Sequence, residues 1–137
     1  MQCVSQGKAG WLATMQVLQR GLRESHQMFL QPPKCECCSD CQRVRQRLAA
    51  SFQSMAAWYE CWEHITSQQL QAVRRGEPPP AMPFPHFELQ LLPGVPEQLP
   101  PSVDRCFRCQ HNLDYYLHKE QELRAEEAAH GDEPVGV

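Results

Sequence analysis

Hydrophobic residues recur at helical spacing in three stretches of this chain. In the first stretch, steps of four and three residues place five side chains on one face, with a single gap at Ser25. These side chains are Trp11, Met15, Leu18, Leu22 and Phe29. Such a stripe is typical of an amphipathic helix, and proline cannot continue a helix. We therefore predict a helix over about residues 9–30, ended by Pro32 and Pro33.

The second stripe is the longest and predicts one uninterrupted helix over residues 39–75. This range contains no proline or glycine, and Gly76 followed closely by three prolines supplies a stop. The stripe comprises Val44, Leu48, Phe52, Met55, Tyr59 and Trp62. A third helix is expected from about Asp104 into the 120s. Its inward residues are expected to be Leu113, Leu117 and Leu123.

Proline changes the pattern between the second and third helices. Residues 76–103 hold nine of the twelve prolines, so we expect an extended connection there. Within it, Phe87, Leu89 and Leu91 alternate with polar residues, which favours a short strand or an apolar strip lying on the helices. We expect residues 1–127 to form a single domain and residues 128–137 to form a disordered tail.

Eight cysteines change the picture further, because no secretion signal accompanies them. In a reducing compartment, cysteines at C-x-x-C spacing favour metal binding over disulfides. Two segments share the form P-P-x4-C-x2-C-Q, and a predicted helix follows each. Their cysteines are Cys38, Cys41, Cys106 and Cys109. Four thiolates complete the tetrahedral shell of structural zinc, so the fold class we expect is mostly α, with about three helices stapled by a four-cysteine Zn²⁺ site.

The expected zinc site also predicts the path of the chain. If zinc joins the starts of the second and third helices, these helices run side by side in the same direction. A helix of about 35 residues is roughly 50 Å long, and the chain must return that distance before Cys106. About 30 extended residues reach roughly 100 Å, so the proline-rich segment is long enough to act as a strap.

Other residues offer alternative metal ligands. Cys35 also forms a C-x-x-C pair with Cys38, and Cys37 lies between them, so the register of the first pair stays open. Cys61 and His64 could join Cys35 and Cys37 in a second metal site, although a buried thiol and a surface histidine explain them more simply. His111 follows the second pair and could replace a thiolate.

Charge and aromatic residues suggest two candidate surfaces. Residues 1–75 carry a net charge of +4 and residues 76–137 a net charge of −7. The candidate nucleic-acid patch consists of Lys34, Arg43, Arg45 and Arg47, for which a solvated helix face that balances the thiolates is the simpler reading. The candidate partner surface consists of Trp58, Tyr59 and Trp62. Most of this aromatic group is expected to be core, although adjacent Trp58 and Tyr59 point to different faces.

The function that these patterns favour is binding, and we expect no enzyme. The sequence contains no phosphate-cradling glycine loop, no G-x-S-x-G and no H-E-x-x-H motif. We expect an intracellular, nuclear or cytoplasmic zinc-binding adaptor with protein partners, no membrane segment and no small-molecule substrate. The alternatives are a nucleic-acid-associated replication or RNA-processing factor and a secreted disulfide-bonded protein.

Around the second cysteine pair the chain reads C-x-R-C-x4-D-x-Y, and an acidic tail follows. The residues are Cys106, Arg108, Cys109, Asp114 and Tyr116. This short pattern resembles the C-terminal region of the small nuclear phosphoprotein of bocaparvoviruses and related parvoviruses. The resemblance implies a nuclear, nonstructural viral accessory protein that supports viral DNA replication and modulates splicing and polyadenylation of viral transcripts. The long Arg/Ser-rich region of that family has no counterpart in these 137 residues, so direct RNA binding does not follow from the resemblance.

Overall fold

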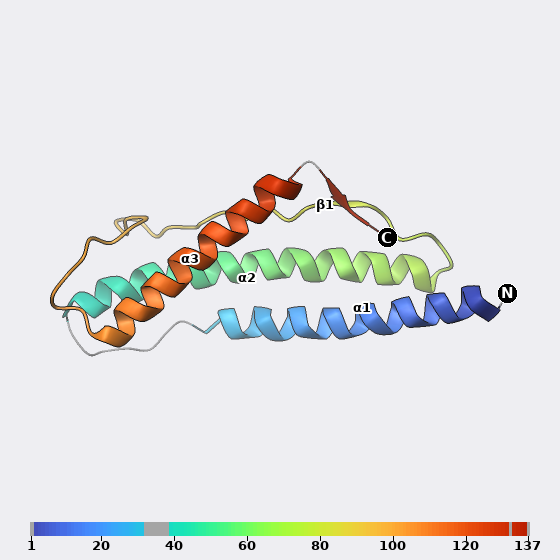
Figure 1. Cartoon of the computed structure of the whole chain (residues 1–137), viewed down its shortest axis with the longest axis horizontal. Coiled ribbons are helices and arrows are strands. Elements are labelled where there is room, and N and C mark those ends of the chain that lie inside the picture. Colours follow the sequence, from blue (N-terminus) through green and yellow to red (C-terminus); the bar gives the residue numbers. More distant parts are fainter. Residues whose placement is uncertain (1, 32–38, 132, 137) are drawn as a thin grey trace.

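A computed structural model describes residues 2–31, 39–131 and 133–136 of the chain. In this part of the chain the main elements are α1 (Gln2–Phe29), α2 (Ser39–Arg74) and α3 (Phe107–His130). Two strands of two residues each, β1 (Met82–Pro83) and β2 (Pro134–Val135), pair antiparallel. The protein is therefore mostly helical, with three long helices as predicted, although α1 begins at Gln2 and not near residue 9 (Figure 1). Within the described residues, no helix combines the length and the apolar character needed to cross a membrane.

Helices α1 and α2 lie side by side and run in opposite directions (Figure 1). The ring of Phe29, at the end of α1, is buried and stacks on Tyr59 of α2 at a centroid distance of 5.6 Å. Nearby, Nδ1 of His26 lies 2.9 Å from Oε1 of Glu63 on α2. Leu18 was expected to point inward but is 45% exposed. The reason is that Met15 and His26 lie on the side of α1 that faces α2, whereas Leu18 lies at the edge of that side.

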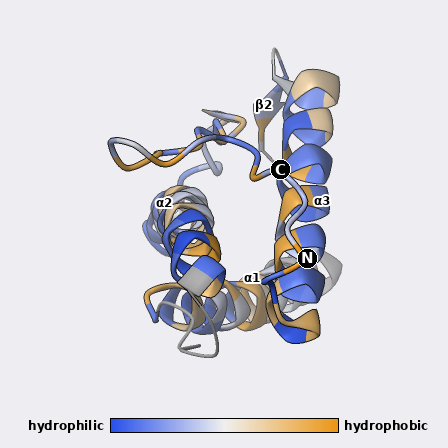
Figure 2. Ribbon diagram, turned by 90° about the vertical axis from the view of Figure 1, so that its left-hand side faces the viewer, coloured by the Kyte–Doolittle hydropathy of each residue, from blue (hydrophilic) through white to orange (hydrophobic). Residues whose placement is uncertain are grey.

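Helix α3 begins at the same end of the molecule as α2 and crosses over it in the same general direction (Figure 1). Its hydrophilic side faces outward when the molecule is viewed along the helices (Figure 2). Two apolar clusters join α3 to the helix pair. One cluster consists of buried Phe29, Met55, Ala56, Trp58, Phe87 and Leu123. The other consists of Cys41, Val44, Leu48, Cys109 and Leu113.

A buried ion pair connects α2 and α3 between the two clusters. The guanidinium of Arg47 donates to both carboxylate oxygens of Glu120, at 2.9 and 2.6 Å, and the two side chains are 0% and 4% exposed. The hydroxyl of Ser51 donates to the same carboxylate, and Nε of Arg47 donates to the backbone oxygen of Glu97. A paired guanidinium with several satisfied donors is the arrangement in which a buried charge is tolerated. Glu120 is therefore part of the buried contact between α2 and α3 and is not solvated.

The segment between α2 and α3 runs back along α2, and polar contacts fix its course. The side-chain amide of Gln69 donates to the backbone oxygen of Pro80, and the backbone N–H of Gln90 donates to Ser54 at 2.7 Å. Together with the bond from Arg47 to Glu97, these contacts run backward along α2 as the segment runs forward. The two-residue strand lies at Met82–Pro83, not at residues 87–91 as one reading of the sequence suggested. Phe87 instead fills the first apolar cluster.

The C-terminal part of the chain differs from the disordered tail expected over residues 128–137. Helix α3 continues to His130, because Ala128 and Ala129 are strong helix formers, and Gly131 follows as its cap. Residues 134–135 form β2 on β1, and the side-chain amide of Gln69 donates to the backbone oxygen of Val135 at 3.2 Å. These contacts tie the C-terminal end to α2 and to the connection.

Removing one partner of the buried ion pair should destabilise the protein strongly. We expect Glu120→Ala to lower the free energy of unfolding by about 3–5 kcal/mol, because it leaves the Arg47 guanidinium buried without its carboxylate. The double variant Arg47→Met with Glu120→Leu should cost much less, since it removes both charges. Urea unfolding followed by circular dichroism measures both. The exposed pair of Arg75 and Glu77 is the control, and its removal should cost less than about 1 kcal/mol.

The pH dependence of stability should reveal how Glu127 of α3 holds the connection. Partial burial alone would raise the pKa of Glu127, but hydrogen bonds from His86 and from the backbone N–H of Phe87 outweigh it and lower the pKa. A carboxylate whose pKa is lowered by folding stabilises above its unfolded pKa, and this contribution disappears as the pH falls through the folded value. Glu127→Gln should therefore lower the melting temperature slightly at neutral pH. That difference should shrink below about pH 4, and a difference independent of pH would contradict the assignment.

Candidate metal centre

Three cysteines meet where α2 and α3 begin. The Sγ atoms of Cys41, Cys106 and Cys109 all lie within 4.8 Å of one another. Cys41 and Cys109 are buried, at 0% and 2% exposed, and Cys106 is half-buried. The structure thus brings together three of the four ligands predicted from the sequence. Cys41 lies 65 residues before Cys106 in the chain, and Cys106 and Cys109 form the second C-x-x-C pair. The fourth, Cys38, lies outside the described residues.

The second cysteine pair is shaped by the start of α3. Cys106 is the N-cap of the helix, with extended backbone angles of φ −70° and ψ 154°. Its sulfur accepts a hydrogen bond from the backbone N–H of Cys109 at 3.4 Å. This bond satisfies one of the N–H groups that every helix leaves unpaired at its first turn. It also turns both sulfur atoms toward the same point, which is the geometry that chelation requires.

The distance between sulfur atoms favours a shared metal ion. Sγ of Cys41 lies 3.6 Å from Sγ of Cys106. A disulfide needs about 2.05 Å, so this spacing is far too long for one. Two thiolates on a tetrahedral zinc with Zn–S bonds of about 2.3 Å lie roughly 3.8 Å apart. The spacing of this one pair, which also suits a hydrogen bond between two thiols, is thus close to that of two ligands on one ion.

Two helix N-termini favour the charged form of these thiols. Cys41 lies in the first turn of α2, and Cys106 and Cys109 lie at the start of α3. The positive end of each helix dipole points toward the sulfur atoms and stabilises thiolates. Val44, Leu48 and Leu113 pack around the cluster and limit the access of water. Low local polarity strengthens charge interactions inside the cluster.

Arg105 locks the two helix starts together beside the sulfur atoms. Its Nε donates to Oδ2 of Asp40 at 2.7 Å, and its side chain is 3% exposed. It also donates to the side chain of Gln110 at 2.9 Å and to the backbone oxygen of Pro100. The hydrogen bond from Arg105 lowers the pKa of Asp40. The carboxylate is therefore charged at neutral pH and holds the start of α2 against the residues that precede α3.

Sequence reasoning did not anticipate the pairing of Asp40 with Arg105. A signal was present, since each residue directly precedes a cysteine of the predicted site. Opposite charges next to cysteines of one site are expected to meet if the two helix starts meet. The pairing itself depends on the three-dimensional approach of the two helices.

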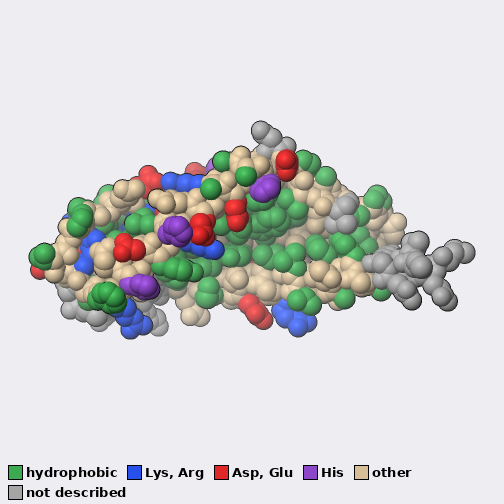
Figure 3. Space-filling model, viewed as in Figure 1, with side chains coloured by type: hydrophobic (Ala, Val, Ile, Leu, Met, Phe, Trp, Pro, Cys, Tyr) green, Lys and Arg blue, Asp and Glu red, His purple; other side chains and the backbone are tan. Residues whose placement is uncertain are grey.

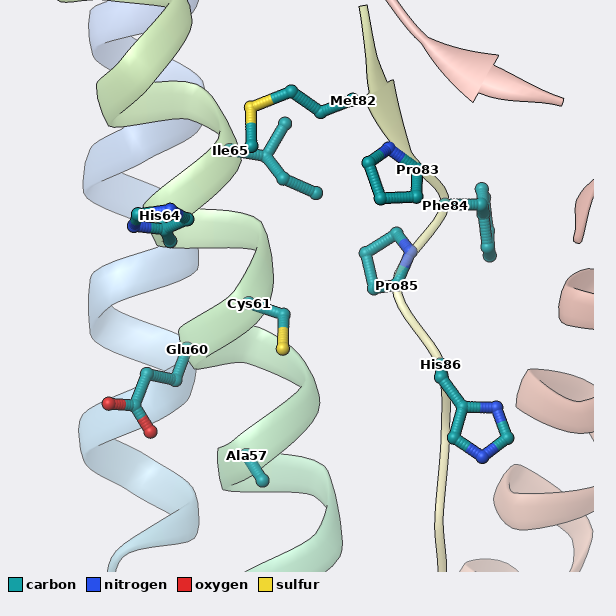
Figure 4. A pocket seen from close by; sticks show the side chains of 10 residues that line it. All are labelled: Ala57, Glu60, Cys61, His64, Ile65, Met82, Pro83, Phe84, Pro85 and His86. Carbon is teal, nitrogen blue, oxygen red and sulfur yellow. The ribbon is translucent and has the colours of Figure 1, made fainter.

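The alternative ligands on α2 lie far from the cluster. Cys61 is twenty residues beyond Cys41 on the same helix, which is about 30 Å. Cys61 and His64 are exposed and line a cavity of about 660 Å³ between α2 and residues 82–86. Figure 4 shows the sulfur of Cys61 directed toward this gap and the ring of His64 directed away from it. Cys35 and Cys37 lie outside the described residues, and among the described ones the three-thiol cluster is the group with metal-ligand spacing.

His111 does not reach the sulfur atoms. It is exposed on α3, and its ring stacks on the ring of Phe107 at a centroid distance of 6.3 Å. His111 is two residues beyond Cys109, and on a helix that offset places it on another side. The structure therefore does not bring this alternative ligand to the cluster.

The basic residues proposed as a nucleic-acid patch do not form one surface. Arg43 is exposed, Arg45 is half-buried, and Lys34 lies outside the described residues. Arg47 is fully buried on Glu120, where no phosphate can reach it. The prediction that Arg47 belongs to this patch is therefore wrong. The reason is that Glu120 of α3 and the backbone of Glu97 in the connection cover this side of α2.

The aromatic residues proposed as a partner surface pack inside the protein. Trp58 is 9% exposed, and its ring lies edge-on to Trp62 at a centroid distance of 5.9 Å. Tyr59 stacks on Phe29, and Trp62 meets Phe84 of the connection edge-on. The aromatic group therefore packs mainly at the junction of α1, α2 and the connection, and it does not form a distinct partner surface.

No protein-family model, no curated protein and no solved structure matches this chain. The assignment of the site therefore depends on the geometry of its residues.

Chemical labelling should distinguish the buried sulfur atoms from the exposed one. We expect iodoacetamide to modify Cys61 at least about tenfold faster than Cys41 or Cys109, because the latter require local opening of the helix ends. Cys106, which is half-buried, should react at an intermediate rate. Mass spectrometry of peptides from timed samples measures these rates. Equal rates at Cys41 and Cys61 in the folded protein would contradict the arrangement.

Proposed function

We propose that this protein is a non-enzymatic adaptor whose helices are held together by one structural zinc ion. The observation that carries the proposal is the cluster of three sulfur atoms at the common start of α2 and α3. Cysteine thiolates with tetrahedral spacing are the ligands that zinc prefers at structural sites. The cluster lies at the end of a hydrophobic core, where a metal ion replaces the apolar contacts that a small protein lacks.

Cys38 is the fourth ligand in this proposal. It precedes Cys41 with C-x-x-C spacing, the same spacing that brings Cys106 and Cys109 together. A shell of four thiolates leaves zinc no open coordination position, so the ion cannot activate water or bind a substrate. The role of such an ion is to fix the fold. The protein then acts through the surfaces that the fixed helices present to other proteins.

The resemblance to the parvoviral nuclear phosphoproteins supports a regulatory role in this proposal. Three residues of the shared pattern have structural explanations here, because Cys106 and Cys109 belong to the sulfur cluster and Tyr116 packs edge-on against Phe52 at a centroid distance of 4.9 Å. Arg108 and Asp114 are exposed, so they are the part of the pattern that a partner could contact. A viral accessory protein of the nucleus is the specific form of the adaptor that this pattern favours.

Zinc content and cysteine replacement test the proposal together. Protein purified under reducing conditions should contain one zinc per chain, as measured by inductively coupled plasma mass spectrometry. Cys109→Ser should lose this zinc and much of its stability, because structural zinc sites contribute roughly 10 kcal/mol or more of folding free energy. Cys61→Ser is the matched control and should keep both, since its thiol is exposed and distant.

The fourth ligand is identified by three further variants. Cys38→Ser should lose zinc, whereas Cys35→Ser and Cys37→Ser should retain it. Loss of zinc in Cys35→Ser instead would shift the register of the first pair. Native protein without zinc, with Cys41 and Cys106 joined by a disulfide, would overturn the metal site and with it the adaptor that the site supports.

A further inference from the structure

The outer face of α3 carries exposed rings that no other element covers in the described structure. Phe107 is 87% exposed and Tyr115 is 57% exposed, and they are the two large aromatic side chains that are exposed in the described part of the chain. Steps of four, four, three and four residues connect one stripe on this face. Its members are Phe107, His111, Tyr115, His118 and Glu122. Figure 3 shows histidine and acidic side chains following one another along this side of the molecule. Exposed aromatic rings on a rigid helix are typical of a contact surface.

The two ends of this face carry opposite charges. Arg108 is exposed in the first turn of α3, seven residues before Tyr115, and Glu122 is exposed seven residues after it. Nε2 of His118 lies 3.0 Å from Oε1 of Glu122, and Nζ of Lys119 lies 3.6 Å from its Oε2, so the carboxylate is held on this face. Seven residues are two turns of helix, or about 10 Å. Tyr115 is therefore the midpoint between one positive and one negative charge on the same stripe.

This order runs against the helix dipole. The first turn of α3 contains no acidic residue and does contain Arg108, while Glu122 and Glu126 lie toward the C-terminal end. Within one helix, positive charge at the N-terminus and negative charge at the C-terminus are unfavourable. A second α3 lying antiparallel would bring the acidic end of one helix to the basic end of the other and would also oppose the two dipoles.

We propose that the outer face of α3 binds a second copy of this chain in an antiparallel arrangement about a two-fold axis at Tyr115. Each Arg108 then lies opposite the partner's Glu122, and the two Tyr115 rings meet at the axis. A two-fold contact places the same residues on both sides, which a face with balanced opposite charges allows. A nucleic acid suits this face poorly, because Glu122 and Glu126 repel phosphate.

The contact should be weak and reversible. One helix face on each side buries less area than the roughly 1,200–2,000 Å² of a standard stable interface. Dimerisation should therefore depend on protein concentration and weaken with added salt, which screens the two exposed ion pairs. The proposal goes beyond the zinc site and requires only that α3 be folded and held with its outer face exposed.

Charge reversal tests the pairing directly. In sedimentation equilibrium at low salt, the wild-type chain should form dimers, and Arg108→Glu or Glu122→Arg alone should weaken dimerisation by about tenfold or more, since each variant places two like-charged pairs across the axis. The double variant with both reversals should restore it. Arg74→Glu, an exposed reversal at the end of α2, is the control and should leave dimerisation unchanged.

Zinc content and circular dichroism of each variant separate this test from that of the metal site. A chain that keeps its zinc and helicity but stays monomeric at every concentration would overturn the dimer and leave the metal site intact. Dimers that do not respond to the single reversals, or that the double variant does not restore, would show that the copies meet elsewhere. Loss of zinc in the wild-type chain would count against the metal site alone.

Discussion

The approach of three thiols at the common start of α2 and α3 is the constraint on which the rest of this structure depends. Cys41 and Cys106 lie 65 residues apart in the chain, yet their sulfur atoms are 3.6 Å apart. Once the two helix starts are joined, the helices must run in the same general direction. The chain must then return along a helix of 36 residues, which is about 54 Å long. A long connection with little regular structure of its own follows from this requirement.

Polar contacts do as much as apolar ones to hold that connection and to position α3. Arg47 binds Glu120 of α3 and the backbone of Glu97, so one buried side chain on α2 positions both elements. Arg105 does the same at the helix starts by binding Asp40 and the backbone of Pro100. Such contacts are directional, whereas hydrophobic contacts tolerate sliding. They select one register between the helices, even though burying charge adds little net stability.

The arrangement leaves two different ends and two different faces. The sulfur cluster lies at one end of the bundle, and Val103 and Phe107, almost fully exposed, precede and follow Cys106 in the chain. The aromatic side chains of α2, in contrast, are turned inward against Phe29 and Phe84. Within the described residues, the large exposed aromatic side chains therefore lie on α3.

The existence of the helices could be predicted from the sequence because it depends on local patterns. The uninterrupted stripe from Val44 to Trp62 predicts α2 almost to its last residue, and the stop at Gly76 has a local cause, since φ there is +81°. The repeated P-P-x4-C-x2-C-Q segments likewise pointed to Cys41, Cys106 and Cys109, because a repeated local context indicates a shared role. That Cys38 joins these three cysteines is still inferred only from its C-x-x-C spacing with Cys41.

Local patterns in the chain thus predicted the three helices, the place of the long connection and the cysteines that come together. Which charged side chains are buried, in contrast, follows from tertiary packing. Arg47 reads as a surface residue because neighbouring arginines flank it, and Glu120 reads as part of an acidic helix end. Whether such charges meet depends on the crossing of two helices and on where a third segment passes over them. No local pattern encodes that geometry, because burial is a property of the packed molecule and not of any one stretch of the chain.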